Sequence, residues 1–261
     1  MAEALDAYRF DGAALGAYHF VWGTFCDWYL ELVKPALQGE NGAAKAEAQA
    51  TAAWVLRSIL HILHPFMPFV TEELWGQFGD GSGFLMNRSW PKPAASGDDT
   101  VLAEVDWVVR LISAIREVRA QLNVPPSAQL EMKVAGEFPA DRFAHYGDII
   151  ARLARIAKVT PIPAGEAIGA HAAQSAQFVV DAATYILPLA GVIDIAKEKA
   201  RLEKEIERLV IEIAKVDKKL SNADFMAKAR PEVVEENQER RAEWQAACDR
   251  LTEAFNRLGD A

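Results

Sequence analysis

Apolar residues recur at helical spacing through roughly the first half of the chain. From Asp11 to Ala36 they return every three or four positions, which predicts a helix with one buried face. Asp11 is suited to cap that helix, and Pro35 is expected to end it. A second alanine-rich and then strongly apolar stretch predicts a helix over 43–64.

Two further helices are predicted before residue 126. The segment 64–68 holds two prolines, which disfavour helical backbone in the residues before them, and Thr71 then resembles the N-cap of a short helix. Apolar positions between 105 and 122 predict a fourth helix, which stops at the Asn-Val-Pro-Pro segment 123–126. Three arginines are expected on its outer side: Arg110, Arg116 and Arg119. Helices joined by fairly short loops predict a bundle over 1–125.

The period changes from helical to alternating between residues 128 and 195. Leu130, Met132 and Val134 alternate with polar residues, as in a half-buried strand. The range 138–156 predicts a helix. Short segments rich in β-branched residues predict three more strands, 158–162, 177–181 and 185–189. The sequence therefore predicts a small α/β module.

The last third of the chain carries two heptad seams. The seams are Leu202, Ile206, Leu209, Ile213, Val216, Leu220 and then Val234, Asn237, Arg241, Trp244, Cys248, Leu251, Phe255, Leu258. Steps of three and four residues are typical of a coiled coil, and Pro231 suits the first turn of the second helix. Two such helices joined by a short link predict an antiparallel hairpin with arms about 40 Å long at 1.5 Å per residue.

The predicted fold class is therefore mainly α: a helical bundle, a small α/β module and a long antiparallel coiled-coil hairpin. We place the domains at 1–125, 126–194 and 195–261.

Composition narrows the classes that this chain can belong to. Hydrophobic residues make up 51% and charged residues 25%, as in a globular protein. No apolar run reaches the ~18–20 residues that span a bilayer, and the first residues lack a secretion signal. Two distant cysteines provide neither a disulfide framework nor a zinc site. We therefore expect a cytoplasmic protein that does not enter a membrane.

Charge argues against a generally basic nucleic-acid binder. Lys and Arg number 28 and Asp and Glu 37, for a net charge of −9. The range 196–261 is nevertheless close to neutral, because it holds half of all the basic residues. Five of them lie at the expected turn of the hairpin: Lys215, Lys218, Lys219, Lys228 and Arg230. They could bind phosphate, or they could be the solvated face of a coiled coil or a contact to another protein.

Catalytic motifs are absent from the sequence: there is no P-loop, no glycine-rich dinucleotide turn and no nucleophile elbow. His61 and His64 lack a third metal ligand at suitable spacing, so packing explains them better. Glu72 and Glu73 could act as acid and base, but they also suit the start of a helix. The aromatic residues of 20–29 are expected in the bundle core, with base stacking by an exposed member as the alternative.

Several longer strings identify a family. Those strings are 8–11, 20–22, 25–31, the His-Pro-Phe-Met-Pro-Phe block 64–69, 71–75, the set Arg116, Arg119, Asn123, Pro125 and Pro126, 189–194, 201–202, and 219–222 with Phe225. Together they resemble the anticodon-binding domain and the C-terminal coiled coil of valyl-tRNA synthetases over nearly the whole chain. The proline-flanked block is also typical of the isoleucyl and leucyl enzymes, but isoleucyl enzymes would be expected to end in zinc-binding cysteine pairs, which this chain lacks.

The resemblance implies that the bundle reads the anticodon loop of valine tRNA and that the hairpin rests on the outer corner of the tRNA. Arg116 and Arg119 are then candidates for the anticodon side, and Lys215, Lys218, Lys219, Lys228 and Arg230 for the corner. Enzymes of this family attach valine to tRNA with ATP and Mg²⁺. Neither of their two catalytic signatures occurs here, so we expect a non-catalytic C-terminal portion without metal or cofactor.

The partners implied are valine tRNA but neither DNA nor a membrane, for a monomeric chain. Two other classes stay open at this stage. A hairpin that pairs with another protein fits the acidic body. An independent enzyme has no supporting group of residues.

Overall fold

The computed structural model of the protein describes residues 1–78, 83–91, 97–163, 174–222, 225 and 229–258. Contacts divide the chain into two compact units, Met1–Asp98 and Asp99–Ala261. The predicted fold class is confirmed, since a helical unit, a small mixed sheet and a two-helix arm are all present. The division into three domains at 125 and 194 stays a prediction. The fourth helix predicted for the bundle is α6 (Asp99–Gln121), which lies in the second unit.

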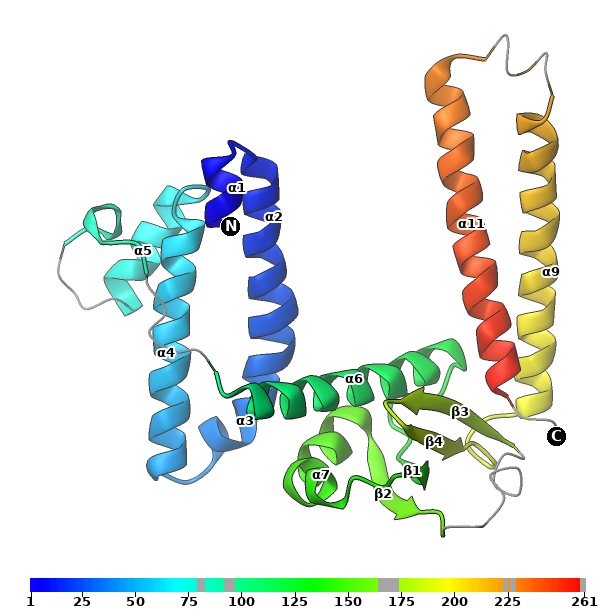
Figure 1. Ribbon diagram of the computed structural model, residues 1–261, viewed down its shortest axis with the longest axis horizontal. Helices are drawn as coiled ribbons and strands as arrows, with labels where there is room; N and C mark the ends of the chain where they lie inside the picture. The colour runs from blue at the N-terminus through cyan, green and yellow to red at the C-terminus, as the bar shows by residue number, and fades with distance from the viewer. Residues whose placement is uncertain (79–82, 92–96, 164–173, 223–224, 226–228, 259–261) are drawn as a thin grey trace. The chain divides into compact units, whose positions relative to one another are not determined.

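The first unit is entirely helical over its described residues. Helices α2 and α3 each pack against α4, and α5 packs on α4 as well (Figure 1). The helices are α1 (Ala2–Asp6), α2 (Phe10–His19), η1 (Phe20–Tyr29), α3 (Leu30–Gln38), α4 (Ala43–Leu63), α5 (Pro68–Phe78) and η2 (Leu85–Asn87).

Three predicted helix boundaries in this unit are wrong. The first helix is capped by Arg9 rather than Asp11 and continues past Pro35 to Gln38, because a proline this close to a helix end removes one hydrogen bond only. Helix α5 begins at Pro68, whose missing N–H costs nothing in a first turn. Thr71 therefore lies inside the helix, and its buried hydroxyl donates to the carbonyl oxygen of Met67 at 2.8 Å.

The aromatic stretch of the first unit also differs from its predicted packing. Phe25 is buried, but Trp22 is 56% and Phe20 41% exposed, so the expectation that the aromatic residues of 20–29 enter the core is wrong. The segment η1 is a π-helix with wider turns. Residues at α-helical spacing therefore do not stay on one face along it.

Over its described residues, the second unit joins a four-stranded sheet to four long helices. Strand order is β2-β1-β4-β3, with β1 and β2 parallel and the other pairs antiparallel. All four predicted strands are present. The elements are α6 (Asp99–Gln121), β1 (Leu130–Gly136), α7 (Ala140–Ala154), β2 (Ile156–Pro161), β3 (Ser175–Val180), β4 (Ala183–Pro188), α9 (Ile195–Leu220) and α11 (Pro231–Arg257).

Helix α6 forms the centre of this unit. Trp107, Leu111 and Ile115 recur at four-residue steps and are almost fully buried, as the 3.6-residue period requires. The helix packs on α7 and β3. The sheet contributes alternating buried residues such as Met132 and Val134 of β1.

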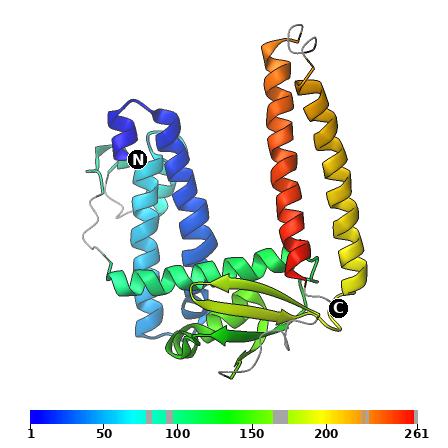
Figure 2. The same ribbon diagram turned by 45° about the vertical axis from the view of Figure 1, so that its right-hand side comes forward.

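Helices α9 and α11 lie side by side as an antiparallel pair, which we call the arm (Figures 1 and 2). Leu209 and Ile213 of α9 pack on Cys248 of α11, flanked by Ile206 and Trp244. These are the predicted seam residues, so the heptad prediction is confirmed. The 26 residues of α9 give a length of about 39 Å.

Candidate nucleic-acid interface

The far end of the arm carries exposed basic residues from both helices. Lys215, Lys218 and Lys219 lie in the last turns of α9 and are exposed. Arg230, the exposed N-cap residue of α11, lies at the same end of the arm. Lys228, the remaining candidate, lies outside the described residues. Four of the five predicted corner-binding residues are therefore brought to one end.

Lys215 already has a carboxylate partner at the surface. Its Nζ lies 2.6 Å from Oε1 of Glu212, one turn earlier on α9, and 61% of the lysine side chain is exposed. Exposed pairs of this kind contribute about 0–1 kcal/mol. A phosphate oxygen could replace Glu212 at little cost.

The two polar seam positions of α11 make specific contacts near this end. Asn237 is buried, and its Nδ2 donates to the carbonyl oxygen of Val233 at 2.7 Å. Nε of Arg241 donates to Oδ1 of Asp217 on α9 at 2.5 Å, and this hydrogen bond raises the pKa of the Arg241 guanidinium. An ion pair thus takes the place of an apolar contact between the two helices.

Helix α11 carries an acidic edge at the same end of the arm. The first turns of α11 expose Glu232, Glu235, Glu236 and Glu239. Arg240 pairs with Glu236 at 2.5 Å. A polyanion would therefore approach the α9 edge and Arg230 rather than this side of α11.

The base of the arm is bonded to the end of α6. Glu198 of α9 is 9% exposed and accepts hydrogen bonds from Nδ2 of Asn123 at 3.1 Å and from Nη2 of Arg201 at 2.6 Å. The carboxylate of Glu198 raises the pKa of Arg201. Asn123 has a φ of 48°, a left-handed conformation that Asn tolerates better than most residues.

Gln121 connects α6 to both arm helices. Its carbonyl oxygen accepts from Arg201 of α9 at 3.2 Å, and its side-chain Oε1 accepts from Nη1 of Arg257 on α11 at 2.8 Å. We call Gln121, Asn123, Glu198, Arg201 and Arg257 the arm-base cluster. This cluster fixes the position at which the two arm helices join the end of α6.

The two arginines proposed for the anticodon side lie in different environments. Arg116 is exposed, and its Nε donates to the carbonyl oxygen of Leu153 at 3.1 Å, near the end of α7. Arg119 is 8% exposed, so the expectation that it lies on the outer side of α6 is wrong. Arg110 is exposed, as expected.

Arg119 instead fixes the turn that follows α6. Its Nη2 donates to the carbonyl oxygens of Pro125 at 3.0 Å and Ala128 at 2.9 Å. Burial lowers the pKa of its guanidinium, with the nearby charge of Arg155 as a second cause. These contacts give Arg119 a structural role in the turn that precedes β1.

The paired glutamates have no catalytic geometry. Oε1 of Glu72 accepts from the backbone N–H of Leu85 at 2.7 Å, and Nε2 of His64 lies 3.9 Å from its other oxygen. His61 packs edge-on against Trp75. Within the ranges that the structure describes, no three His, Cys, Asp or Glu side chains gather as metal ligands would.

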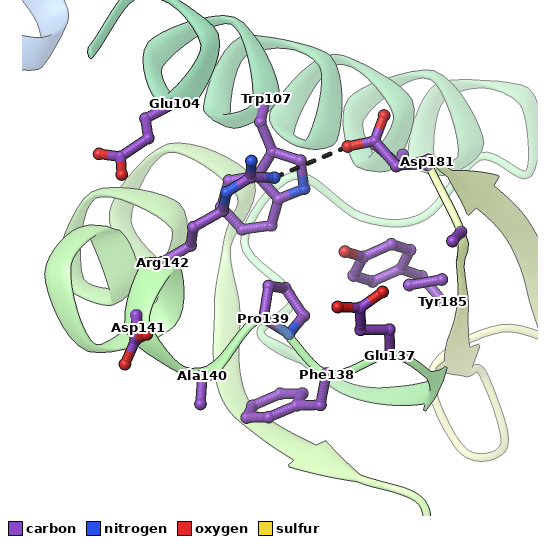
Figure 3. A pocket seen from close by; sticks show the side chains of 13 residues that line it. Glu104, Trp107, Glu137, Phe138, Pro139, Ala140, Asp141, Arg142, Asp181 and Tyr185 are labelled. Atoms are coloured by element: carbon purple, nitrogen blue, oxygen red, sulfur yellow. Dashed lines mark ion pairs between the residues drawn. The ribbon is translucent and has the colours of Figure 1, made fainter. Parts of the chain in front are cut away.

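A polar cavity of about 590 Å³ lies between α6, α7 and the β3–β4 turn (Figure 3). Two of its charged residues are paired: Asp181 binds Arg110 of α6 at 2.6 Å, and Arg142 lies 3.7 Å from Asp181 and over the ring of Trp107. The hydrogen bond from Arg110 lowers the pKa of Asp181. These ion pairs join α6 and α7 to the β3–β4 turn, and Glu104, Glu137 and Asp141 also line the cavity.

Comparison with known proteins places this architecture in a family. Residues 1–134 match the anticodon-binding domain of tRNA ligases, and residues 194–259 match the valyl tRNA synthetase tRNA binding arm. The first match covers just over half of the chain, so the chain belongs to the anticodon-binding domain family of tRNA ligases. The predicted resemblance is confirmed at both ends of the chain.

The particular relatives are valine–tRNA ligases. The chain is 47% identical to the enzyme of Caulobacter vibrioides, 46% to that of Granulibacter bethesdensis and 43% to that of Mesorhizobium japonicum. These matches take in 98–100% of the chain but only 28–29% of each relative. The chain therefore corresponds to less than a third of a valine–tRNA ligase.

The structural role of Arg119 is tested by Arg119→Met, with Arg116→Met on the same helix as the control. We expect Arg119→Met to lower the free energy of unfolding by roughly 1–3 kcal/mol, because the carbonyl oxygens of Pro125 and Ala128 each lose the hydrogen bond from Arg119. Arg116→Met should cost less, since Arg116 is exposed. Urea denaturation measures both. Unchanged stability of Arg119→Met together with weaker tRNA binding would instead favour the anticodon role.

The arm-base cluster is tested at Asn123, where glycine and alanine separate two effects. Asn123→Gly removes the hydrogen bond to Glu198 and keeps the left-handed backbone, so we expect a loss of about 1 kcal/mol in unfolding free energy. Asn123→Ala should lose about 1 kcal/mol more through backbone strain. Chemical denaturation of the two variants provides the comparison. If Asn123→Gly is as stable as the unaltered chain, the bond to Glu198 does not anchor the arm.

Proposed function

We propose that this chain is the tRNA-recognition portion of a valine–tRNA ligase. In this proposal the N-terminal bundle reads the anticodon loop of valine tRNA, and the arm contacts the outer corner of the folded tRNA. The observation that carries the proposal is the cluster of exposed basic residues at the far end of an arm whose sequence matches the valyl tRNA synthetase tRNA binding arm. Arg116 and Arg119 stay predictions for the anticodon side.

Two kinds of RNA recognition suit the two parts. Anticodon bases are single-stranded and can be unstacked and read by hydrogen bonds and aromatic faces. A folded corner offers mainly shape and phosphates, which need only correctly spaced cations. An arm of about 39 Å can hold its basic end at a distance from its base.

The length of the arm also reduces the repulsion between RNA bound at its far end and the rest of this acidic chain. The whole chain carries −9, which repels RNA at long range. At physiological ionic strength, however, charges are screened beyond about 8 Å. The base of the arm lies several such lengths from its tip, so the charges nearest the tip dominate contact with a phosphate there. Those are Lys215, Lys218, Lys219 and Arg230, the carboxylates of Glu212 and Asp217, which pair with Lys215 and Arg241, and the exposed glutamates of α11.

Catalysis belongs, in this proposal, to parts of the ligase that this chain does not contain. The two catalytic signatures expected of the family are absent from the sequence, and Glu72 accepts a hydrogen bond from the backbone N–H of Leu85. ATP and Mg²⁺ are then used elsewhere in the enzyme when valine is joined to tRNA. We further propose a cytoplasmic setting and a monomeric chain that binds neither DNA nor a membrane.

No helix in the described residues combines the length and the apolar character needed to cross a bilayer.

A protein-binding arm is the second candidate. The acidic edge of α11 favours it, because Glu232, Glu235, Glu236 and Glu239 repel RNA and could meet a basic partner. Binding of valine tRNA against a second tRNA, alongside light scattering for self-association, separates the two functions.

The tip is tested by a double charge reversal, Lys218→Glu with Lys219→Glu. The matched control is Lys197→Glu with Lys204→Glu, which makes the same charge change at exposed positions nearer the base of α9. If about four groups neutralise phosphates, the logarithm of the affinity should fall against that of the salt concentration with a slope of roughly −3 to −4. The tip variant should lose at least tenfold in affinity and about two units of slope.

Gel-shift titrations of valine tRNA across salt concentrations measure both quantities. The control variant should stay within about twofold of the unaltered chain, because its charges lie beyond the screening length from the tip. A flat salt response, or equal losses in the two variants, would contradict phosphate binding by the tip.

A further inference from the structure

The first unit exposes large apolar side chains on one face. Leu15 and Tyr18 of α2 and Trp22 of η1 are each more than half exposed, and Met67, before α5, is 44% exposed. Single exposed apolar residues are ordinary, but a contiguous group of aromatic and aliphatic side chains on a monomer marks an interaction surface.

These side chains line one hollow. Its volume is about 580 Å³, and it lies between α2, η1 and the corner after α4. We call it the Trp22 face, with Leu15, Tyr18, Trp22, Cys26, Phe66 and Met67 as its members. Asp11 is the only carboxylate among the described residues that line it, and neither lysine nor arginine is among them.

The chemistry of the hollow favours a protein over RNA. An RNA surface needs cations beside its aromatic residues, because phosphates dominate its affinity. The Trp22 face offers a carboxylate in their place. Tryptophan, tyrosine, phenylalanine and methionine are the residues enriched at the centres of protein–protein interfaces.

The comparisons point to one occupant. The valine–tRNA ligase of Caulobacter vibrioides matches 99% of this chain, yet about seven-tenths of that enzyme lies outside the match. A chain this similar folds in the relative beside a large amount of further polypeptide. An apolar face that is uncovered here is the surface that such polypeptide would cover.

We propose that the Trp22 face docks the part of a valine–tRNA ligase that lies outside the region matched by this chain. The proposal rests on the assignment of the chain to such a ligase, and it is independent of RNA binding by the arm. Trp22 and Tyr18 act as the apolar centre of the contact. The shallow hollow between them receives an apolar side chain of the partner.

The direct test mixes this chain with the separately produced remainder of the Caulobacter vibrioides enzyme. Calorimetry or surface plasmon resonance measures their association. Trp22→Asp should weaken it at least thirtyfold, as expected for a central interface residue. The matched control is Trp54→Asp, because Trp54 is 54% exposed on the same unit but lies outside the Trp22 face. Equal affinity of the unaltered chain and Trp22→Asp would overturn the proposal, as would equal losses in the two variants.

A second measurement does not require the remainder to fold alone. In a chimera, this chain replaces the matched region of the Caulobacter vibrioides enzyme, and mass spectrometry follows the rate at which Cys26 is alkylated. Cys26 is partly exposed within the Trp22 face, whereas Cys248 is buried in the arm and serves as the internal control. Alkylation of Cys26 should be at least tenfold slower in the chimera than in the chain alone. An unchanged rate at Cys26 would overturn the proposal.

Two other occupants would be recognised by their own results. If Trp22→Asp weakens the binding of valine tRNA by the chain alone, the face contacts RNA. If light scattering detects a dimer that Trp22→Asp abolishes, the face binds a second copy. Either result overturns the proposal. If the charge reversal of Lys218 and Lys219 does not weaken tRNA binding, the proposal for the Trp22 face still stands. RNA binding by the arm and docking by the Trp22 face can therefore fail separately.

Discussion

The apolar seam between α9 and α11 is the constraint on which the functional account depends. Leu209, Ile213 and Cys248 hold two long helices together, far from the sheet that anchors them. Neither helix could stay extended alone, because most helical stability in proteins comes from packing. The seam therefore keeps the arm extended and holds its far end at a fixed distance from its base. That distance exceeds the length over which salt screens the charges near the base. A chain of net charge −9 can in this way present a basic edge to RNA.

The seam needs a fixed starting point, which the arm-base cluster supplies. Gln121 bonds to both helices of the arm, and Asn123 reaches Glu198 from the same turn. Arg119 holds the following turn through two backbone carbonyls. The end of α6 thus organises both the sheet and the arm, so a change there is expected to alter the direction of the arm as well as stability.

The sequence correctly predicted the elements in which a pattern of apolar residues repeats along the chain. The heptads of α9 and α11 and the alternation in β1 extend over many residues, and each repeat reinforces the same structure. The sequence did not predict contacts between residues far apart in the chain, such as Asn123 with Glu198 or Asp217 with Arg241. Arg119 lies four residues after Ile115 and so continues the buried steps of Trp107, Leu111 and Ile115. Its charge suggested an outer position, but the helical period placed it on the buried face. Trp22 was misplaced because a π-helix changes the period on which the prediction depended.

The central claim is that the end of the arm lies against the outer corner of valine tRNA. A photo-crosslinking residue placed at Ser221, which is exposed beside Lys218 and Lys219, tests that claim directly. The account predicts crosslinks to nucleotides of the outer corner when the tRNA is sequenced, and their loss at high salt. Crosslinks that map to the acceptor stem or the anticodon loop, or none at saturating tRNA, would contradict it.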